Sequence, residues 1–201
     1  MVVDSNESEI APLHSTRLLS LTFARLAQFP KSVYDAKELR TILSLNSKHA
    51  SINAILPNLC QHLTCLRALN LSDSSIEKVP NEIKNLEYLR FLDLSSNYKI
   101  EELPEMLCNL CNLQTLNVSG YYMLEKLSEG MGKLINLRHL VLEGTNFMKM
   151  FPKEIGRLSS LRTLTKFIRS GHDESEGSGL KELGNMNQLE GALEINCWIF
   201  L

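Results

Sequence analysis

The fold of this chain is decided by one stretch, VPNEIKNLEYLRFLDLS, which covers residues 79–95. Apolar residues follow Pro80 at intervals of three, at positions 83, 86 and 89. An interval of three places side chains along one side of a 3₁₀ turn. Leucines then follow at 92 and 94, and a spacing of two places side chains on the same face of a β-strand. The stretch therefore predicts a short turn that leads into a short strand.

The same pattern recurs along the chain. It starts again at Pro57, Pro104, Ser128 and Pro152, so the period is 23 or 24 residues. Such a period is typical of stacked units whose strands pair with their neighbours and whose leucines form one continuous core. The spacing Leu-x-x-Leu-x-Leu is half of the leucine-rich-repeat signature. We therefore predict an α/β fold: a leucine-rich-repeat solenoid with a curved parallel sheet on its concave face and short 3₁₀, helical or irregular segments on its convex face.

The repeats also define the domain organisation. Residues 1–13 are predicted to form a polar lead-in, and residues 14–197 hold about seven to eight repeats, most regular at 57–168. The glycine- and serine-rich segment 169–179 predicts a mobile surface loop. Residues 198–201 form an apolar end. Because solenoids need polar caps, we expect the chain to be a fragment of a longer protein.

Two early segments carry the pattern in a weaker form. Leu18–Thr22 predicts the first strand, with Leu19 and Leu21 facing inward. A less regular form of the interval-of-three pattern, which we call the ladder, begins at Pro30, 27 residues before the first regular ladder at Pro57. We therefore expect extra loop residues on the convex side at 46–53.

The strand at 41–45 has an ambiguous register. Counting along the ladder puts Ile42 inward, whereas a distance of 24 residues from the first strand puts Leu43 and Leu45 inward. A slip by one residue moves every side chain to the other face. We expect Leu43 and Leu45 to face inward.

Composition excludes several classes of partner. The chain has 201 residues, is 44% hydrophobic and carries a formal net charge of −2. Such a charge provides no global basic field, so we expect neither nucleic acid nor an anionic membrane as the main partner. No stretch approaches the roughly 20 apolar residues that span a bilayer. The five cysteines lack a disulfide framework, which favours a reducing compartment, cytoplasmic or nuclear.

No arrangement of residues indicates catalysis, a cofactor or a metal. Cys108 and Cys111 have the spacing of half a zinc knuckle, but no second pair accompanies them. The ladder places both thiols on outward positions beside Leu107 and Leu110. Cys60 takes an inward slot and is expected in the core. The histidines show no spacing typical of a metal site or of a nucleophile with its base. We predict a protein that is not an enzyme.

Alternation along the strands defines the outer, concave face of the sheet, which we predict to be the surface that binds a protein partner. Small polar groups mix there with Phe91, His139 and Phe167, as aromatic and adaptable side chains do at interfaces. The alternative is an ordinary solvated sheet face. The predicted residues are Ala68, Asn70, Ser72, Phe91, Asp93, Ser95, Thr115, Asn117, Ser119, His139, Val141, Glu143, Thr163, Thr165 and Phe167.

Acidic residues recur on the flanking turns. Glu101, Glu102, Glu125 and Glu129 are among them, and most are expected to form a solvated edge. A further hypothesis is that they present a negative rim to a basic surface.

Three segments carry a resemblance to a known family. The stretches VPNEIKNLEYLRFLDLS at 79–95, LQTLNV at 113–118 and LRHLVL at 137–142 resemble the repeat region of plant nucleotide-binding leucine-rich-repeat disease-resistance proteins of the coiled-coil type. The resemblance covers residues 14–195. It implies intracellular pathogen sensing in the defence response, through binding of a pathogen effector, a guarded host protein or a neighbouring nucleotide-binding module that the repeats hold inactive. No such module lies within these residues.

An alternative is an intracellular leucine-rich-repeat scaffold of the Ras-related signalling type. The repeat signature has an asparagine slot, which lies three residues after the last leucine of the strand. Only Asn97 fills it here, while Ser74, Tyr121 and Thr145 occupy the equivalent positions of the other repeats. The scaffolds tend to fill this slot with asparagine. The residues therefore favour the immune family, and no uninterrupted asparagine ladder is expected.

Overall fold

The structure is a computed structural model, and it describes residues 2–4, 15–22, 31–45, 51–169 and 180–197. The predicted apolar end and all but the first residue of the predicted mobile loop lie outside the described residues.

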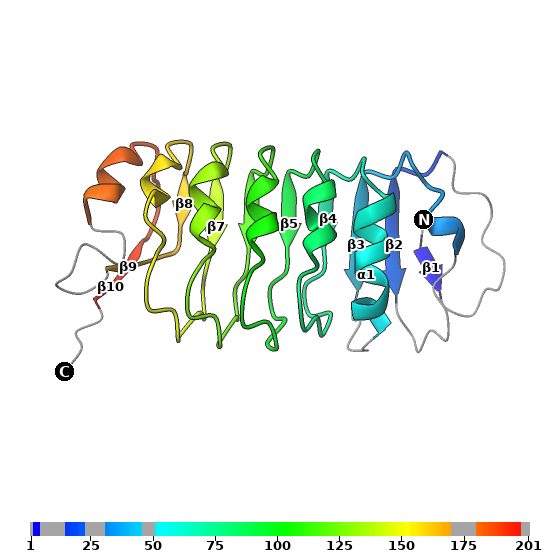
Figure 1. Cartoon of the computed structure of the whole chain (residues 1–201), viewed down its shortest axis with the longest axis horizontal. Coiled ribbons are helices and arrows are strands. Elements are labelled where there is room, and N and C mark those ends of the chain that lie inside the picture. The colour runs from blue at the N-terminus through cyan, green and yellow to red at the C-terminus, as the bar shows by residue number, and fades with distance from the viewer. Residues whose placement is uncertain (1, 5–14, 23–30, 46–50, 170–179, 198–201) are drawn as a thin grey trace.

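Within the described residues, eight parallel strands form one sheet in chain order (Figure 1). They are β1 (Val2–Asp4), β2 (Leu18–Thr22), β3 (Thr41–Leu45), β4 (Ala68–Asn70), β5 (Phe91–Asp93), β6 (Thr115–Asn117), β7 (His139–Val141) and β8 (Thr163–Leu164). Two further strands, β9 (Lys166–Arg169) and β10 (Glu194–Cys197), pair in parallel as a second sheet. This order confirms the predicted solenoid, and β1 adds a strand inside the predicted polar lead-in.

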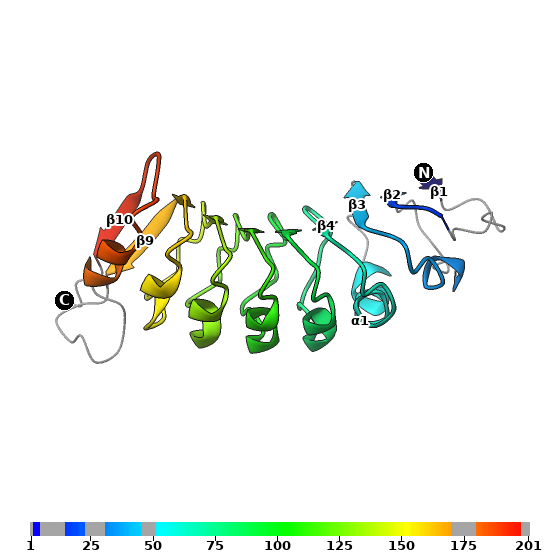
Figure 2. The same ribbon diagram turned by 90° about the horizontal axis from the view of Figure 1, so that it is seen from above.

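Short helical segments cover the other side of the sheet. They are η1 (Lys31–Val33), α1 (Ser51–His62), η2 (Asn81–Asn85), η3 (Glu105–Asn109), η4 (Glu129–Lys133), η5 (Ile155–Arg157) and η6 (Leu180–Asn185), where η marks a 3₁₀ helix. Figure 2 shows the strands along the inner curve and these segments along the outer curve. The predicted interval-of-three turns are confirmed as η2 to η5.

The predicted convex loop at 46–53 is wrong where the structure describes it. Residues 51–53 belong to α1, which runs through Pro57 and ends at His62. Ile52, Leu56 and Leu59 are all buried, so the added length puts more apolar side chains into the core. The extra residues therefore lengthen the turn into an α-helix.

The predicted register of β3 is also wrong. Leu19 pairs with Ile42, 23 residues later, and both side chains are fully buried. Leu43 is only half-buried and faces the concave side. The ladder count was correct because the shorter period of 23 residues applies between β2 and β3.

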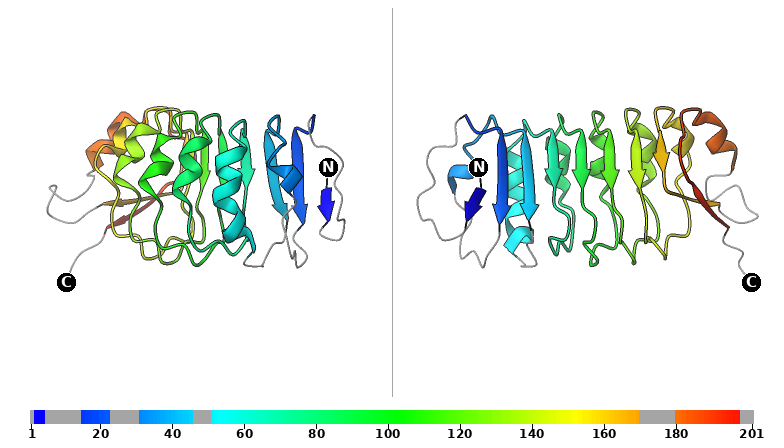
Figure 3. Two further views of the ribbon diagram at one scale, coloured as in Figure 1. Left: turned by 45° about the vertical axis from the view of Figure 1, so that its right-hand side comes forward. Right: turned by 180° about the vertical axis from the view of Figure 1, so that it is seen from behind.

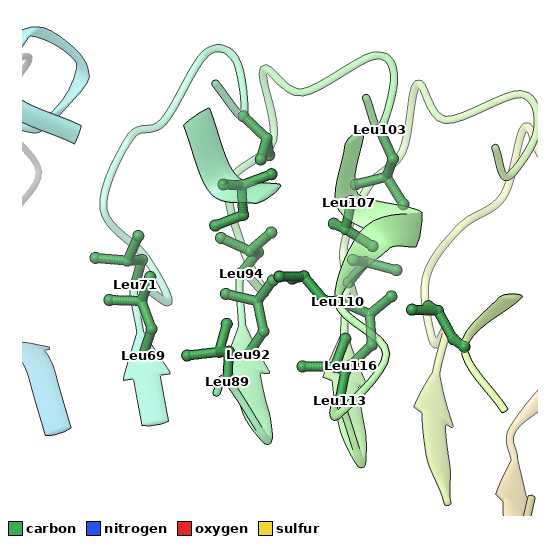
Figure 4. Close-up of a cluster of buried hydrophobic side chains, with 14 of the residues drawn as sticks. Leu69, Leu71, Leu89, Leu92, Leu94, Leu103, Leu107, Leu110, Leu113 and Leu116 are labelled. Atoms are coloured by element: carbon green, nitrogen blue, oxygen red, sulfur yellow. The ribbon is translucent and has the colours of Figure 1, made fainter. Parts of the chain in front are cut away.

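The core is a continuous column of leucines between the sheet and the convex turns (Figure 4). Each repeat supplies its ladder residues from the turn and its alternating residues from the strand; for example, Leu107, Leu110, Leu113 and Leu116 are all fully buried. Complete burial of such a side chain contributes about 1.5 to 3 kcal/mol relative to exposure. Stacking therefore supplies burial that one coil could not obtain alone.

Neighbouring convex turns approach one another closely enough to require small residues. Cys108, predicted to face outward, is buried because η4 packs beside η3: a Cβ at Gly130 would lie 3.1 Å from the Cβ of Cys108. One repeat later, a Cβ at Gly132 would lie 2.6 Å from the carbonyl oxygen of Glu154. The outward prediction was wrong for Cys108, whereas Cys111 is exposed as expected.

The substitution Gly132→Ala is expected to lower the free energy of unfolding by about 1 to 3 kcal/mol, because the added methyl group meets backbone rather than a movable side chain. Gly184 holds the same position in η6, but no atom lies within 4 Å of its added Cβ. Gly184→Ala should therefore change stability by less than about 0.5 kcal/mol. Urea unfolding followed by circular dichroism compares the two variants, and equal effects would contradict the assigned contact.

Candidate functional site

The concave face brings together most of the residues predicted for it. Fourteen of the fifteen predicted residues are at least partly accessible to solvent. Among them, Phe91 and Glu143 are exposed and the other twelve are half-buried. The sheet lies open on this side, as the view from behind in Figure 3 shows. Phe91 pairs with Thr115, and Thr115 pairs with His139, in the register of β5, β6 and β7. The nitrogen Nδ1 of His139 lies 3.1 Å from the hydroxyl oxygen of Thr163.

Phe167 does not lie on this face, and its prediction is wrong. Its side chain is fully buried and packs against Phe151, with ring centroids 5.0 Å apart. The chain bends at Thr165, between β8 and β9. The alternation counted along an unbroken strand therefore fails after the bend.

Several of the polar groups on the concave face are engaged with each other. The carboxamide oxygen of Asn70 accepts hydrogen bonds from both the amide and the hydroxyl of Ser72, at 2.9 and 2.8 Å. Asp93 with Ser95, and Asn117 with Ser119, repeat this arrangement. These pairs satisfy backbone groups where the strands end. Their side chains are therefore committed to local structure before any partner arrives.

A column of arginines lies along the amino-end rim of the concave face, and sequence reasoning missed it. In each repeat the residue directly before the strand occupies this column, and five of the six arginines are exposed, with Arg40 half-buried. The column consists of Arg17, Arg40, Arg67, Arg90, Gln114, Arg138 and Arg162. We call it the arginine column. The dipeptide Leu-Arg, which directly precedes β3, β4, β5, β7 and β8, was the signal that could have revealed it.

Main-chain hydrogen bonds fix the spacing of the arginine column. The carbonyl oxygen of Arg67 accepts hydrogen bonds from the amides of Arg90 and Phe91, at 2.8 and 3.1 Å. The carbonyl oxygen of Arg138 likewise accepts from Arg162 and Thr163, at 2.7 and 2.9 Å. Successive rungs are consequently about 4.8 Å apart. The guanidinium groups form no ion pair among the described residues, so their charge is available to a partner.

The acidic residues on the flanking turns are partly neutralised within the chain. Glu125 pairs with Lys149 at 2.7 Å, and Glu77 pairs with Lys99 at the same distance. Both pairs are largely exposed, and exposed pairs contribute little stability. Glu101, Glu102 and the concave-face Glu143 form no ion pair within the described part of the chain.

The two buried thiols, Cys60 and Cys108, offer little chemistry. Burial raises the pKa of Cys60 to about 12, with a smaller contribution from Glu82. Burial also raises the pKa of Cys108 to about 11, with the charge of Glu105 acting in the same direction. Both thiols are therefore protonated and poorly nucleophilic near neutral pH. Among the described residues, no group of His, Cys, Asp or Glu could hold a metal ion.

Comparison with curated proteins finds similarity over a part of the chain. A stretch of 48 residues is 40% identical to the putative disease resistance protein RGA1 of Solanum bulbocastanum; it covers 24% of this chain and 5% of that protein. The chain therefore spans a small part of this curated relative. In the part of the chain that the structure describes, no helix has the length and apolar character needed to cross a membrane.

Solved structures share the fold. A leucine-rich-repeat protein of Leptospira interrogans superposes with a TM-score of 0.71 at 27% identity, over 92% of this chain and 45% of that one. The plant peptide hormone receptor RGFR1, solved in complex with RGF2, gives a TM-score of 0.60 at 24% identity, over 90% and 32%. An internalin of Listeria monocytogenes gives 0.56 at 15% identity, over 88% and 53%. This chain thus spans less than two thirds of each of these structures.

The family follows from the sequence match and the geometry together. Residues 30–198 match the family described as leucine-rich repeat region. The parallel sheet, the convex 3₁₀ turns and the leucine core are those of a repeat solenoid. The chain belongs to the leucine-rich-repeat family.

Proposed function

We propose that this chain is the protein-recognition part of a plant intracellular immune receptor, and that it binds an acidic protein surface through the arginine column and the adjoining concave face. The single observation that carries the proposal is the arginine column: a row of cations on a fixed main-chain register, without ion pairs among the described residues. The similarity to a putative plant disease resistance protein supports the immune role.

The length of the arginine column favours a protein partner rather than a small molecule. Rungs about 4.8 Å apart extend the column over seven successive repeats, from Arg17 to Arg162. Phe91 and His139 lie one residue beyond Arg90 and Arg138, so aromatic groups adjoin the cations. Arginine and aromatic residues are the types enriched at interface hot spots. A partner would therefore present carboxylates along a row, with apolar groups beside them.

Three kinds of partner fit this role in an immune receptor. They are a pathogen effector, a guarded host protein and a neighbouring nucleotide-binding module, each recognised by an acidic surface. Binding to the first two would make the repeats a sensor, and binding to the third would make them an inhibitory contact. No chemical step is involved in any of these, so the chain acts by binding alone.

Charge reversal of the arginine column tests the proposal. The variant Arg67→Glu/Arg90→Glu/Arg138→Glu should bind a fluorescent glutamate–leucine peptide at least about tenfold more weakly than the wild-type chain, measured by fluorescence anisotropy. Wild-type affinity should fall as salt rises, because the contacts are exposed charges. The same variant should also lose the acidic proteins that the wild-type chain retains from extracts of infected Solanum leaves.

The matched control for charge reversal is Arg157→Glu. This arginine lies on the convex turn η5 and pairs with Glu154 at 3.0 Å. Its reversal should leave peptide binding within about twofold of wild type. Equal losses in the control and the column variant, or retention of the same leaf proteins by both, would remove the arginine column from the function.

A further inference from the structure

A second exposed surface lies at the opposite ends of the strands from the arginine column. Where β5, β6 and β7 pass into the convex turns, large apolar side chains stand in solvent. They are Tyr98, Tyr122, Met123 and Phe147, with exposed fractions of 53, 45, 51 and 53%. We call these four residues the carboxyl-end edge. Because all strands of the sheet are parallel (Figure 1), this edge and the arginine column lie at opposite ends of the strands.

The tyrosines of the carboxyl-end edge pack against each other and against the neighbouring backbone. Their rings stack with centroids 5.5 Å apart and planes 17° from parallel. Each ring also lies over a glycine of the following repeat: a Cβ at Gly120 would lie 3.4 Å from Tyr98, and a Cβ at Gly144 would lie 3.9 Å from Tyr122. Ordered rings lose little conformational entropy when a partner covers them.

The charge around the carboxyl-end edge is opposite to that of the arginine column. Two lysines of this edge, Lys99 and Lys149, are bound by Glu77 and Glu125 of the preceding repeat. Glu101, Glu102 and Glu143 make no ion pair in the described residues, and neither do the exposed Lys78 and Lys126, which hold the position of Glu102 in the two neighbouring repeats. Three carboxylates and two lysines thus remain without an ion pair in the described residues, so the unpaired charge at this edge is slightly negative.

We propose that the carboxyl-end edge is a second docking surface, for a polypeptide segment that presents lysine or arginine together with apolar side chains. Apolar groups of the segment would cover Met123 and Phe147. Cationic groups would lie over the tyrosine faces and near Glu101 and Glu102, since a cation is attracted both to an aromatic face and to a carboxylate. The proposal concerns a site of opposite charge to the arginine column and stands independently of it.

Titration with two fluorescent peptides tests the proposal. One alternates lysine with leucine, and the other alternates glutamate with leucine. The wild-type chain should bind the lysine peptide with an affinity that falls at high salt. The variant Tyr98→Ser/Tyr122→Ser/Phe147→Ser should bind that peptide at least about tenfold more weakly, while its affinity for the glutamate peptide stays that of wild type.

The control replaces two exposed apolar residues elsewhere, Tyr88→Ser/Ile135→Ser, with exposed fractions of 58 and 52% in the wild-type chain. It should bind the lysine peptide as wild type does, and unchanged urea midpoints establish that both variants fold. The variant Glu101→Gln/Glu102→Gln should show a weaker salt dependence for this peptide. Equal losses in edge and control variants overturn the proposal.

Sedimentation separates a foreign partner from a second copy of the chain. The wild-type chain should remain monomeric at the concentrations used for the peptide titration. Wild-type dimers that disappear in the Tyr98→Ser/Tyr122→Ser/Phe147→Ser variant would assign the edge to self-association and overturn the proposal. The two proposals can fail separately, because the carboxyl-end edge and the arginine column consist of different residues. The binding of the glutamate peptide tests the arginine column, and the binding of the lysine peptide tests the carboxyl-end edge.

Discussion

Replacing Asn97 with alanine is expected to lower the free energy of unfolding by about 3 to 5 kcal/mol, because it leaves several buried backbone groups without partners. The Asn97 carboxamide nitrogen donates to the carbonyl oxygens of Leu71 and Leu94, at 2.9 and 2.6 Å. Its oxygen accepts from the amides of Ser74 and Ile76, at 3.0 and 2.9 Å. One fully buried side chain thus holds two successive turns together.

The control for this prediction is Asn117→Ala. Asn117 is half-buried, and within the described residues its side-chain oxygen accepts hydrogen bonds from the amide and the hydroxyl of Ser119. Its loss should cost about 1 kcal/mol or less, because water can replace it at the open sheet face. Urea unfolding monitored by circular dichroism measures both variants. Comparable losses for the two asparagines would show that the Asn97 network is not what ties the turns together.

The asparagine slot illustrates how far the sequence determines the interior. The signature predicted that only Asn97 would fill it, and the structure buries Ser74, Tyr121 and Thr145 in the equivalent slots. The hydroxyl of Thr145 bonds within its own turn, to the carbonyl oxygen of Leu142 at 2.7 Å. The hydroxyl of Tyr121 is buried without a partner among the described residues, and burial raises its pKa well above the usual value.

The fold could be predicted because a strict period repeats the same physical requirement many times. The errors in strand register, in the convex segment at 51–53 and in the position of Phe167 arose where the period changed, whereas Cys108 was wrongly placed because neighbouring turns pack closely. A shorter spacing reversed the expected face of β3, and additional residues became the first part of α1. The bend at Thr165 turned Phe167 into the core. Periodicity carries no signal for such local breaks, because it assumes one constant spacing along the chain.

The arginine column was present in the sequence but hidden by the way charge was counted. The formal net charge of −2 averages basic and acidic residues over the whole chain. In a solenoid, charge acts by position within the repeat, since equivalent residues stack into rows. Counted by position, Arg67, Arg90 and Arg138 fall in one row, whereas the carboxylates of Glu101 and Glu125 fall in another. A small net charge therefore conceals two edges of opposite sign.

Replacing Phe151 with alanine is expected to lower the free energy of unfolding by about 3 to 5 kcal/mol. Phe151 is fully buried and packs against Phe167, with the two rings tilted by 33°. Removing the ring leaves a cavity where the last regular repeat meets the strand after the bend at Thr165, so relaxation there is limited by packing on both sides. Denaturant unfolding measures the loss, and the slope m shows whether the end repeats separate from the rest.

Phe147→Ala is the matched control, since Phe147 lies on the same connection as Phe151 but is 53% exposed. Its replacement should change stability by less than about 0.5 kcal/mol. A double-mutant cycle on Phe151 and Phe167 should give a coupling of about 0.5 to 1.5 kcal/mol, the range for paired aromatic rings. Additive losses in that cycle would contradict an energetic interaction between the two rings.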